Sequence, residues 1–343
     1  MTAMPLLGPL AAAAPAAAAE PRPLVRASGL TKRFVTGGSW FPSRRRVLTA
    51  VDDVSFAVMP GETLGLVGES GCGKSTLGRC LTRLHDLSGG RLEFDGRDIG
   101  ALPMRRMRPL RAELQMVFQD PHASLNPRRR IGDLLAEPLR VHRLASPSEI
   151  EARIAELLAS VELPADFSRR YPHELSGGQR QRIGIARALA LRPKLIVADE
   201  PVSALDVSVQ AQIVNLFCDL RDRFNLTYVF IAHDLAVVRQ ISTRVAVMYL
   251  GAIVEIGDVD AIFEAPRHPY TAALLDAIPE PHLGARKARS ARLPGKEPPS
   301  PANIPAGCRF EPRCARARDR CRKERPRLEA KDGGTLAACH FPL

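Results

Sequence analysis

A glycine-rich stretch, Gly68–Ser75, combines the residue types that bind phosphate groups. It lies within LGLVGESGCGKSTL and follows the spacing G-x-x-x-x-G-K-S. The apolar run before it predicts a buried strand and the residues after it a helix, so backbone N–H groups and a helix N-terminus would face an anion. The lysine of this spacing reaches the β- and γ-phosphates of ATP, and the serine hydroxyl ligates Mg²⁺. We expect the nucleotide to be bound here by Gly68, Ser70, Gly71, Gly73, Lys74, Ser75 and Thr76.

Two adjacent carboxylates follow a second apolar run, LIVADE. Neighbouring residues of a strand point to opposite sides, so Asp199 and Glu200 can have different functions. Asp199 at the carboxyl end of the strand can hold Mg²⁺ through water, and Glu200 can polarise the attacking water as general base. Together with the upstream loop, this pair predicts a site that hydrolyses ATP.

Two more polar residues end apolar runs of the same kind. Gln119 ends MVFQ, where it can sense the metal and the water, and His233 ends VFIAH. A histidine at a strand end is more often structural, but His233 would lie beside the γ-phosphate if the strands are neighbours. We therefore predict Glu200, His233 and Gln119 as catalytic residues, and Ser75, Gln119 and Asp199 as the Mg²⁺ site.

The segments that position these residues alternate between strand and helix patterns. KLIVAD and TYVFIAH are continuous apolar runs, which is typical of strands buried on both faces. SEIEARIAELLASVEL carries apolar residues at helical spacing, and KSTLGRCLTRL is also predicted to be helical. Shorter strands are expected in VDDVSFAVMPGETLGLVG, GGRLEFDG and ELQMVF. Strands that alternate with helices predict an α/β fold with a parallel sheet.

The charge of the chain is concentrated at its end. The formal net charge is +12, and residues 281–343 contain 15 Lys and Arg against 6 Asp and Glu. A basic tail fits an acidic partner such as nucleic acid, lipid headgroups or an acidic protein face, and it equally fits a solvated basic surface. The apolar and charged fractions, 45% and 25%, are those of a globular protein.

The first residues are rich in alanine and proline. MPLLGPLAAAAPAAAAEPRP lacks the basic start of a signal peptide, and its prolines break any long helix. We predict residues 1–23 to be a disordered leader and the chain to remain in the cytosol.

A third glycine-rich motif, LSGGQRQR at Leu175–Arg182, distinguishes this sequence from other phosphate-loop enzymes. With GESGCGKST, Gln119, LIVADE, SALD and His233 in this order and spacing, the chain resembles the ATP-binding cassette (ABC) family. FQDPHASLNPR, YPHELSGGQRQRI, DEPVSALDVSVQAQI and PRHPYTAALL are similar to the second ATP-binding subunit of dipeptide/oligopeptide importers. The resemblance implies a RecA-like core, an antiparallel β subdomain and a helical subdomain over residues 24–280. Residues 281–343 would form a linker and a small C-terminal cysteine-rich module.

The resemblance also implies how ATP is used. The family's ATPases act as head-to-tail pairs, so Ser176 and Gly178 would contact the γ-phosphate in the partner's site, and Asp206 would lie near that site across the interface. An aromatic ring upstream of the phosphate loop stacks on adenine; the candidate is Phe34, with Trp40 and Phe41 as weaker rivals.

The implied partners are a paralogous ATP-binding subunit in a heterodimer, two transmembrane permease subunits and an extracytoplasmic substrate-binding protein, with no nucleic acid. We expect the stretch Gln119–Glu137 to contact the permease, and the chain to lie peripherally on the cytoplasmic membrane face. The cargo is predicted to be a dipeptide or oligopeptide. An importer for nickel or another cargo, or a soluble ABC-type ATPase acting on nucleic acid, are the alternatives.

Four cysteines cluster at the end of the chain: Cys308, Cys314, Cys321 and Cys339, with the spacing C-x5-C-x6-C-x17-C. Zinc sites use closer pairs, free thiols need not cluster, and iron–sulfur ligand spacing is looser. The spacing leaves all three readings open, and the resemblance to the importer branch favours a [4Fe–4S] cluster. Arginines around Cys314 and Cys321 would then balance the negative charge of the cluster.

Overall fold

The computed structural model describes residues 22–36, 46–120, 124–277, 299, 304–331 and 334–343. Most of the expected leader, the rival aromatic residues Trp40 and Phe41, and most of the linker lie outside these residues. The same holds for positions 121–123 of the expected permease contact. The domain boundary predicted after residue 280 also lies outside them and stays a prediction.

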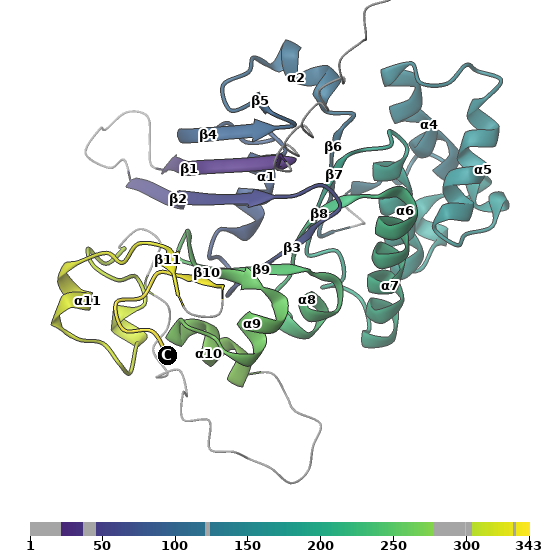
Figure 1. The fold of residues 1–343 in the computed structure, drawn as a ribbon. Coiled ribbons are helices and arrows are strands. Elements are labelled where there is room, and N and C mark those ends of the chain that lie inside the picture. The colour runs from purple at the N-terminus through teal and green to yellow at the C-terminus, as the bar shows by residue number, and fades with distance from the viewer. Residues whose placement is uncertain (1–21, 37–45, 121–123, 278–298, 300–303, 332–333) are drawn as a thin grey trace, which may run out of the picture.

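A mixed sheet forms the centre of the molecule, and its strands run in the order β11-β12-β10-β9-β3-β8-β7-β6 (Figure 1). The strands from β9 to β6 in this order are parallel to their neighbours. The predicted apolar runs are among them, and β7 and β8 are buried at every position, as expected for strands covered on both faces. The bounds are β3 Thr63–Val67, β6 Leu114–Val117, β7 Leu195–Asp199, β8 Thr227–Ile231, β9 Arg244–Tyr249 and β10 Ala252–Asp258.

A second, antiparallel sheet covers one side of the core, with the strand order β2-β1-β4-β5. Its alternating pattern buries Val51, Val54 and Val58 of β2 in the same apolar cluster as Leu64 and Leu66 of β3. The bounds are β1 Val25–Thr36, β2 Arg46–Val58, β4 Gly89–Phe94 and β5 Arg97–Asp98. The Pro-Gly turn after β2 therefore leads from one sheet into the other and does not close a hairpin.

The helices lie on both sides of the central sheet, and α4 to α7 project from one end of it (Figure 1). In α5 the predicted positions Ile150, Ile154 and Leu158 are buried, which confirms the helical spacing. The helices are α1 Lys74–Leu81, α2 Met104–Leu110, α4 Ile131–His142, α5 Ile150–Ser160, α6 Gly177–Leu189, α7 Val207–Phe224, α8 Leu235–Ile241, α9 Val259–Glu264, α10 Pro269–Asp276 and α11 Asp319–Lys323, with short 3-10 turns η2 Ala165–Arg169, η3 Pro172–Glu174 and η4 Glu311–Arg313. None of the helices in the described ranges is both long and apolar enough to span a membrane.

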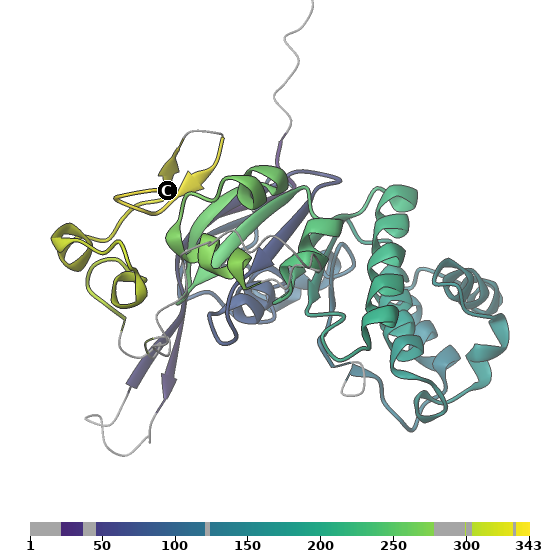
Figure 2. The same ribbon diagram turned by 90° about the horizontal axis from the view of Figure 1, so that it is seen from below.

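The end of the chain packs against the core at the opposite end of the molecule from α4 and α5 (Figures 1 and 2). Strand β12 (Leu336–Ala337) pairs with β10, and β11 (Glu329–Ala330) pairs with β12. Phe310 is buried and contacts the rings of Tyr249 and Tyr270, with centroid distances of 5.4 Å to each. The expected separate cysteine-rich module is not confirmed, because these residues extend the central sheet and its core.

Candidate functional site

The topology brings the predicted residues to one edge of the central sheet. In the order β3-β8-β7-β6, the strands are parallel, so their carboxyl ends lie side by side. The loop Gly68–Ser75 follows β3, and His233 follows β8. Asp199 and Glu200 end β7, and Gln119 follows β6. Ligands of open α/β sheets bind at this edge.

The phosphate-binding loop folds around the side chain of Lys74. The Lys74 Nζ donates hydrogen bonds to the carbonyls of Gly68 at 2.7 Å and Glu69 at 3.1 Å. Gly73 has φ 107°, and a Cβ at this position would lie 2.1 Å from the carbonyl oxygen of Ala50. Only glycine fits there, because both the backbone angle and the space exclude a side chain.

A hydroxyl and a carboxylate meet at the start of α1. The Ser75 Oγ donates a 2.7 Å hydrogen bond to Asp199 Oδ1. Burial raises the pKa of Asp199, and the hydrogen bond from Ser75 opposes this shift. Hydroxyl and carboxylate oxygens are the ligands that Mg²⁺ prefers, so this pair fits a magnesium ion bound with a nucleotide.

Glu200 lies between two of the predicted catalytic side chains. Gln119 Nε2 donates to Glu200 Oε2 at 3.0 Å, and His233 Nδ1 is 3.5 Å from the same oxygen. Glu200 has φ 45°, a conformation that is uncommon for residues with side chains and occurs often at functional sites. Its backbone is fixed by a hydrogen bond from its N–H to Ile231 and by one from the Ser203 hydroxyl to its carbonyl, both 3.0 Å.

These side chains surround an open cavity of about 550 Å³, which is lined by Ser70, Gln119, Asp120, Glu200, Ser203, Ala204 and His233. Asp120 belongs to the stretch predicted to contact the permease, and Ser203 and Ala204 had no predicted individual role. Their positions gave a signal, since Asp120 directly follows Gln119 and the other two belong to the SALD motif. The cavity is large enough for the terminal phosphate and the attacking water.

Phe34 lies on β1, apart from the carboxylates. Its half-buried ring meets His85 edge-on, with ring centroids 5.5 Å apart, and the Lys32 ammonium lies 4.9 Å from the ring centroid. The Lys32 ammonium therefore lies over one face of the Phe34 ring. The stacking of adenine on Phe34 stays a prediction.

Ser176, Gly178 and Asp206 do not line the cavity around Glu200. Ser176 begins α6 in a capping box, because its Oγ accepts from the Gln179 N–H at 3.3 Å and its own N–H donates to the Gln179 side chain at 3.0 Å. At Gly178 a Cβ would lie 2.6 Å from Val209 Cγ1 of α7. Asp206 precedes α7 and makes no side-chain cap to it. Ser176 and Gly178 thus lie at the N-terminus of α6 and Asp206 at the N-terminus of α7, and none of the three lines the cavity around Glu200.

The four cysteines near the C-terminus line one cavity of about 10 Å³ and are all free thiols. Burial raises the pKa of Cys308 to about 11 and also raises the pKa of Cys314 and of Cys339. Within the described ranges, no three His, Cys, Asp or Glu side chains form a group that could hold a metal ion. The prediction of a [4Fe–4S] cluster on Cys308, Cys314, Cys321 and Cys339 is therefore wrong.

The arginines near these cysteines also have a different function from the predicted one. Arg313 pairs with Glu69, Arg320 with Glu324, and Arg322 with Glu311. Their charges are balanced by carboxylates, and no cluster charge is needed to explain them.

Two known protein families match parts of this chain. Residues 51–203 match the family described as ABC transporter, and residues 254–321 match the oligopeptide/dipeptide transporter C-terminal region. The chain is 51% identical over 317 residues to the probable peptide ABC transporter ATP-binding protein y4tS of Sinorhizobium fredii, covering 92% of this chain and 89% of the relative. It is 47% identical over 325 residues to the oligopeptide transport ATP-binding protein AppF of Bacillus subtilis, covering 94% of this chain and 99% of AppF.

The chain belongs to the ABC transporter family of ATP-binding proteins. A solved ATP-binding cassette, MJ0796, described as a dimer in a post-hydrolysis state bound to ADP and Pi, superposes with a TM-score of 0.61. The two chains are 28% identical in sequence, and the superposition covers 68% of this chain and 98% of MJ0796. The match confirms the ABC ATPase fold that the motifs predicted. The assignment of the edge that carries Lys74, Asp199 and Glu200 as the ATP site of this ABC protein stays a prediction.

Proposed function

We propose that this chain is the ATP-hydrolysing subunit of a membrane importer for oligopeptides or dipeptides. The observation that carries the proposal is the convergence of Lys74, the Ser75–Asp199 pair and Glu200 with its two contacts, Gln119 and His233, on one edge of the central sheet. Relatives with about 50% sequence identity to this chain are named peptide or oligopeptide transport proteins. The alignments cover almost the whole length of these relatives.

The side chains of the site suggest their roles in hydrolysis. Lys74 leaves the two loop carbonyls to bind phosphate oxygens, while backbone N–H groups from Ser70 to Thr76 surround the phosphates. Mg²⁺, when bound, neutralises charge on the phosphates, and Ser75, Asp199 and Gln119 are its proposed protein ligands. The Ser75–Asp199 contact supports this assignment because the two oxygens already lie together.

Glu200 is the proposed general base. It is only partly exposed, with 15% of its side-chain surface accessible, and it faces the open cavity. Gln119 and His233 contact the same carboxylate oxygen and hold it in one orientation. A water in this cavity would lose its proton to Glu200 as it attacks the γ-phosphate. His233 lines the same cavity and is proposed to hold the γ-phosphate and the water in line.

Hydrolysis requires a second cassette, and we propose a related but different subunit in a head-to-tail pair. Ser176 and Gly178, at the N-terminus of α6, would bind the γ-phosphate held by the partner, and Asp206 would lie at the same interface. The position of these residues away from the cavity of their own chain supports this arrangement. Phe34 is the proposed adenine contact.

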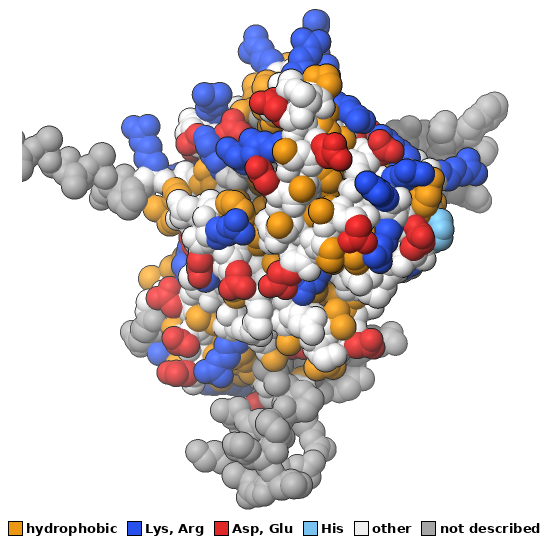
Figure 3. Space-filling view, turned by 90° about the vertical axis from the view of Figure 1, so that its right-hand side faces the viewer, with side chains coloured by type: hydrophobic (Ala, Val, Ile, Leu, Met, Phe, Trp, Pro, Cys, Tyr) orange, Lys and Arg blue, Asp and Glu red, His pale blue; other side chains and the backbone are white. Residues whose placement is uncertain are grey.

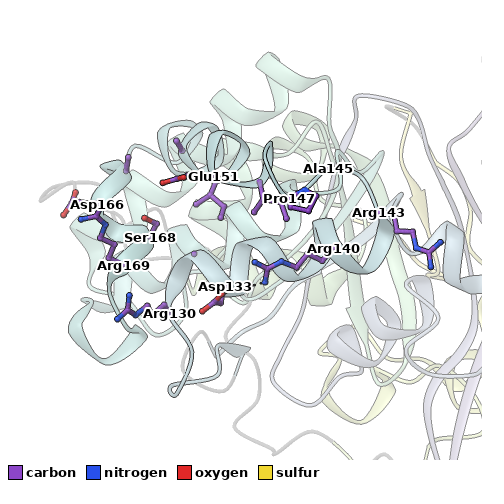
Figure 4. Close-up of a pocket in the computed structure, with 15 residues that line it drawn as sticks. Arg130, Asp133, Arg140, Arg143, Ala145, Pro147, Glu151, Asp166, Ser168 and Arg169 are labelled. Carbon is purple, nitrogen blue, oxygen red and sulfur yellow. Dashed lines mark ion pairs between the residues drawn. The ribbon is translucent and has the colours of Figure 1, made fainter.

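Two permease subunits are the proposed membrane partners, and a groove of about 980 Å³ on the helical region is the proposed place of contact (Figure 4). The groove lies between α4, α5 and η2. Its lining includes Arg130, Gly132 and Asp133, which belong to the stretch predicted to contact the permease. Arg140 and Asp133, both on α4, form an ion pair along its side of the groove at 3.8 Å. A short permease helix in this groove would transmit movement of the cassette pair to the membrane.

The surface of the helical region supports a protein partner more than a nucleic acid. On the face shown in Figure 3, positive and negative side chains alternate with apolar ones. A nucleic-acid surface carries a continuous basic stripe. We propose that the chain acts on the cytoplasmic membrane face, and that an extracytoplasmic binding protein delivers the peptide.

The test is ATP hydrolysis by the complex of this chain with its partner cassette and permease. We expect turnover to rise when the binding protein is loaded with peptide and to stay basal when nickel is supplied instead. The substitution Ala145→Trp, which fills the groove, should prevent binding of the permease and leave ATP binding unchanged. Val141→Trp, near the end of α4 and four positions before Ala145, is the matched control, because Val141 is exposed but does not line the groove. Stimulation by nickel and not by peptide would contradict the proposed cargo.

A further inference from the structure

The C-terminal segment, defined as residues 304–331 and 334–343, contacts the phosphate-binding loop directly. The guanidinium of Arg313 donates to both carboxylate oxygens of Glu69, at 2.8 Å and 2.9 Å. Glu69 is the second residue of the loop, and the Arg313 side chain is only 6% exposed. Two parallel bonds between a planar guanidinium and a carboxylate fix orientation as well as distance.

Glu69 is held at its backbone too. Its N–H donates to the Tyr270 hydroxyl at 2.9 Å, and its carbonyl accepts from Lys74 Nζ at 3.1 Å. Tyr270 is buried and packs against Phe310, three residues before Arg313. A continuous set of contacts therefore leads from the C-terminal segment through Glu69 to the lysine that binds phosphate.

A second set of contacts reaches the other half of the loop. Arg309 donates to the Leu250 carbonyl and to the Asp52 carboxylate, and Arg325 donates to the same carboxylate at 3.0 Å. The turn Leu250–Gly251 has positive φ values of 42° and 83°. The Gly251 N–H donates to the Cys72 carbonyl at 2.8 Å, and the Gly251 carbonyl accepts from the Asp52 N–H at 2.8 Å. The loop is thus supported on both sides by arginines of the C-terminal segment.

We propose that the C-terminal segment sets the affinity of the site for ATP, and that Arg313 is the positioning residue through which it does so. This inference rests on the proposed ATPase function and extends it, because it gives the end of the chain a role in nucleotide binding. Arg313 acts through Glu69 and does not touch the phosphates itself.

The expected direction follows from charge. Glu69 lies five positions before Lys74, within the loop that surrounds the triphosphate. In the observed structure its negative charge is neutralised by Arg313. Without the arginine, an unpaired carboxylate beside the phosphates would repel them, and the loop would lose its support. Removing the carboxylate as well should restore part of the affinity.

The experiment titrates the purified full-length chain with a fluorescent ATP analogue and compares R313Q, E69Q and the double variant. We expect R313Q to raise the Kd about tenfold, within the range typical for coupling between sites. The double variant should recover at least part of this loss. R322Q is the matched control: Arg322 pairs with Glu311 at 3.1 Å in the same segment, does not touch the loop, and should leave the Kd unchanged.

The assembled transporter provides a second readout. R313Q should raise the KM for ATP with little change in kcat, because Glu200 and Gln119 are untouched. A residue needed only for folding would instead lower the thermal midpoint, with no recovery in the double variant. If R313Q does not fold, Tyr270→Phe keeps the ring and removes one contact to Glu69, and it should weaken binding by about threefold.

Wild-type affinity in folded R313Q, or in Tyr270→Phe, would contradict the inference. So would a double variant that binds as weakly as R313Q alone. These outcomes leave the ATPase function intact. A wild-type chain that does not bind the analogue would instead contradict the proposed function, and the inference with it.

Discussion

Ser75 and Asp199 are 124 positions apart in the sequence, and their side chains meet at 2.7 Å. Asp199 is almost completely buried at the end of β7, while Ser75 lies in the first turn of α1. Burial of this carboxylate is unfavourable by itself, because burial disfavours the charged form, and the hydrogen bond from Ser75 offsets only part of that cost. We propose that a bound cation offsets the rest.

This cost predicts the effect of Asp199→Asn. Burial raises the pKa of Asp199 above its usual value of 3.8, so folding favours the protonated form. The free energy of unfolding therefore falls as pH rises from about 3.8 through the raised pKa, and it stays low at pH 7. Asparagine avoids this loss and can still accept from Ser75. We expect the thermal midpoint without nucleotide at pH 7 to rise by roughly 1 to 3 °C.

The same variant should lose Mg²⁺-dependent ATP binding, which calorimetry with and without Mg²⁺ would measure. A lower midpoint, or nucleotide binding that depends on Mg²⁺ as in the wild type, would contradict the assignment of Asp199 to the metal.

Glu200→Gln should separate binding from chemistry. Glutamine retains the shape of the side chain and its contact with Gln119 but cannot accept a proton. We expect hydrolysis by the assembled complex to fall at least about 100-fold, as for loss of a general base. ATP binding should stay within about twofold. Glu264→Gln, at the exposed end of α9, is the control and should have no effect. Undiminished hydrolysis would remove Glu200 from the role of base.

Ser176→Arg tests the head-to-tail pair. A long charged side chain at the start of α6 would occupy the space of the partner's phosphate, so hydrolysis at the partner's site should stop. Binding at the Lys74 loop of the same chain should persist, as measured on the isolated subunit. Ser176→Ala removes the helix cap, at about 1 kcal/mol of stability, and the proposed hydroxyl contact to the partner's phosphate, so it should slow hydrolysis less than Ser176→Arg does. Loss of binding at the variant's own loop would show that the predicted geometry is wrong.

His268 predicts an acid dependence of stability. Complete burial lowers the pKa of His268 from its usual value of 6.5 to about 3. Between these two pH values, His268 therefore stays neutral in the folded protein and takes up a proton in the unfolded protein. The free energy of unfolding therefore decreases as pH falls below about 6.5, by about 2 kcal/mol at pH 5 from this residue. His268→Asn can still cap α10, where the His268 Nδ1 accepts from the Tyr270 N–H at 3.1 Å.

Urea unfolding at pH 7 and pH 5 would measure this difference in the wild type and in His268→Asn. We expect the decrease between the two pH values to be about 2 kcal/mol smaller in the variant. An equal decrease in both proteins would show that another group titrates.

The sequence predicted the parts of the site that depend on local pattern. The loop Gly68–Ser75 has fixed spacing, and β7 and β8 are uninterrupted apolar runs, so the polar residues at their ends could be placed in advance. The Arg313–Glu69 pair had no such signal, because its members are 244 positions apart and each looks like an ordinary surface charge. The pairing of β12 with β10 was missed because a strand of two residues has no periodicity. The cysteine cluster was predicted from family resemblance, and the buried thiols do not support it.

The most direct test of the central claim is peptide uptake by proteoliposomes that contain this chain, its partner cassette and the two permease subunits. ATP is supplied on the cassette side and the peptide-loaded binding protein on the other. We predict peptide uptake that requires ATP, that stops with Glu200→Gln and that continues with Glu264→Gln. Peptide uptake by the Glu200→Gln complex at the wild-type rate, or ATP hydrolysis without any peptide uptake, would contradict it.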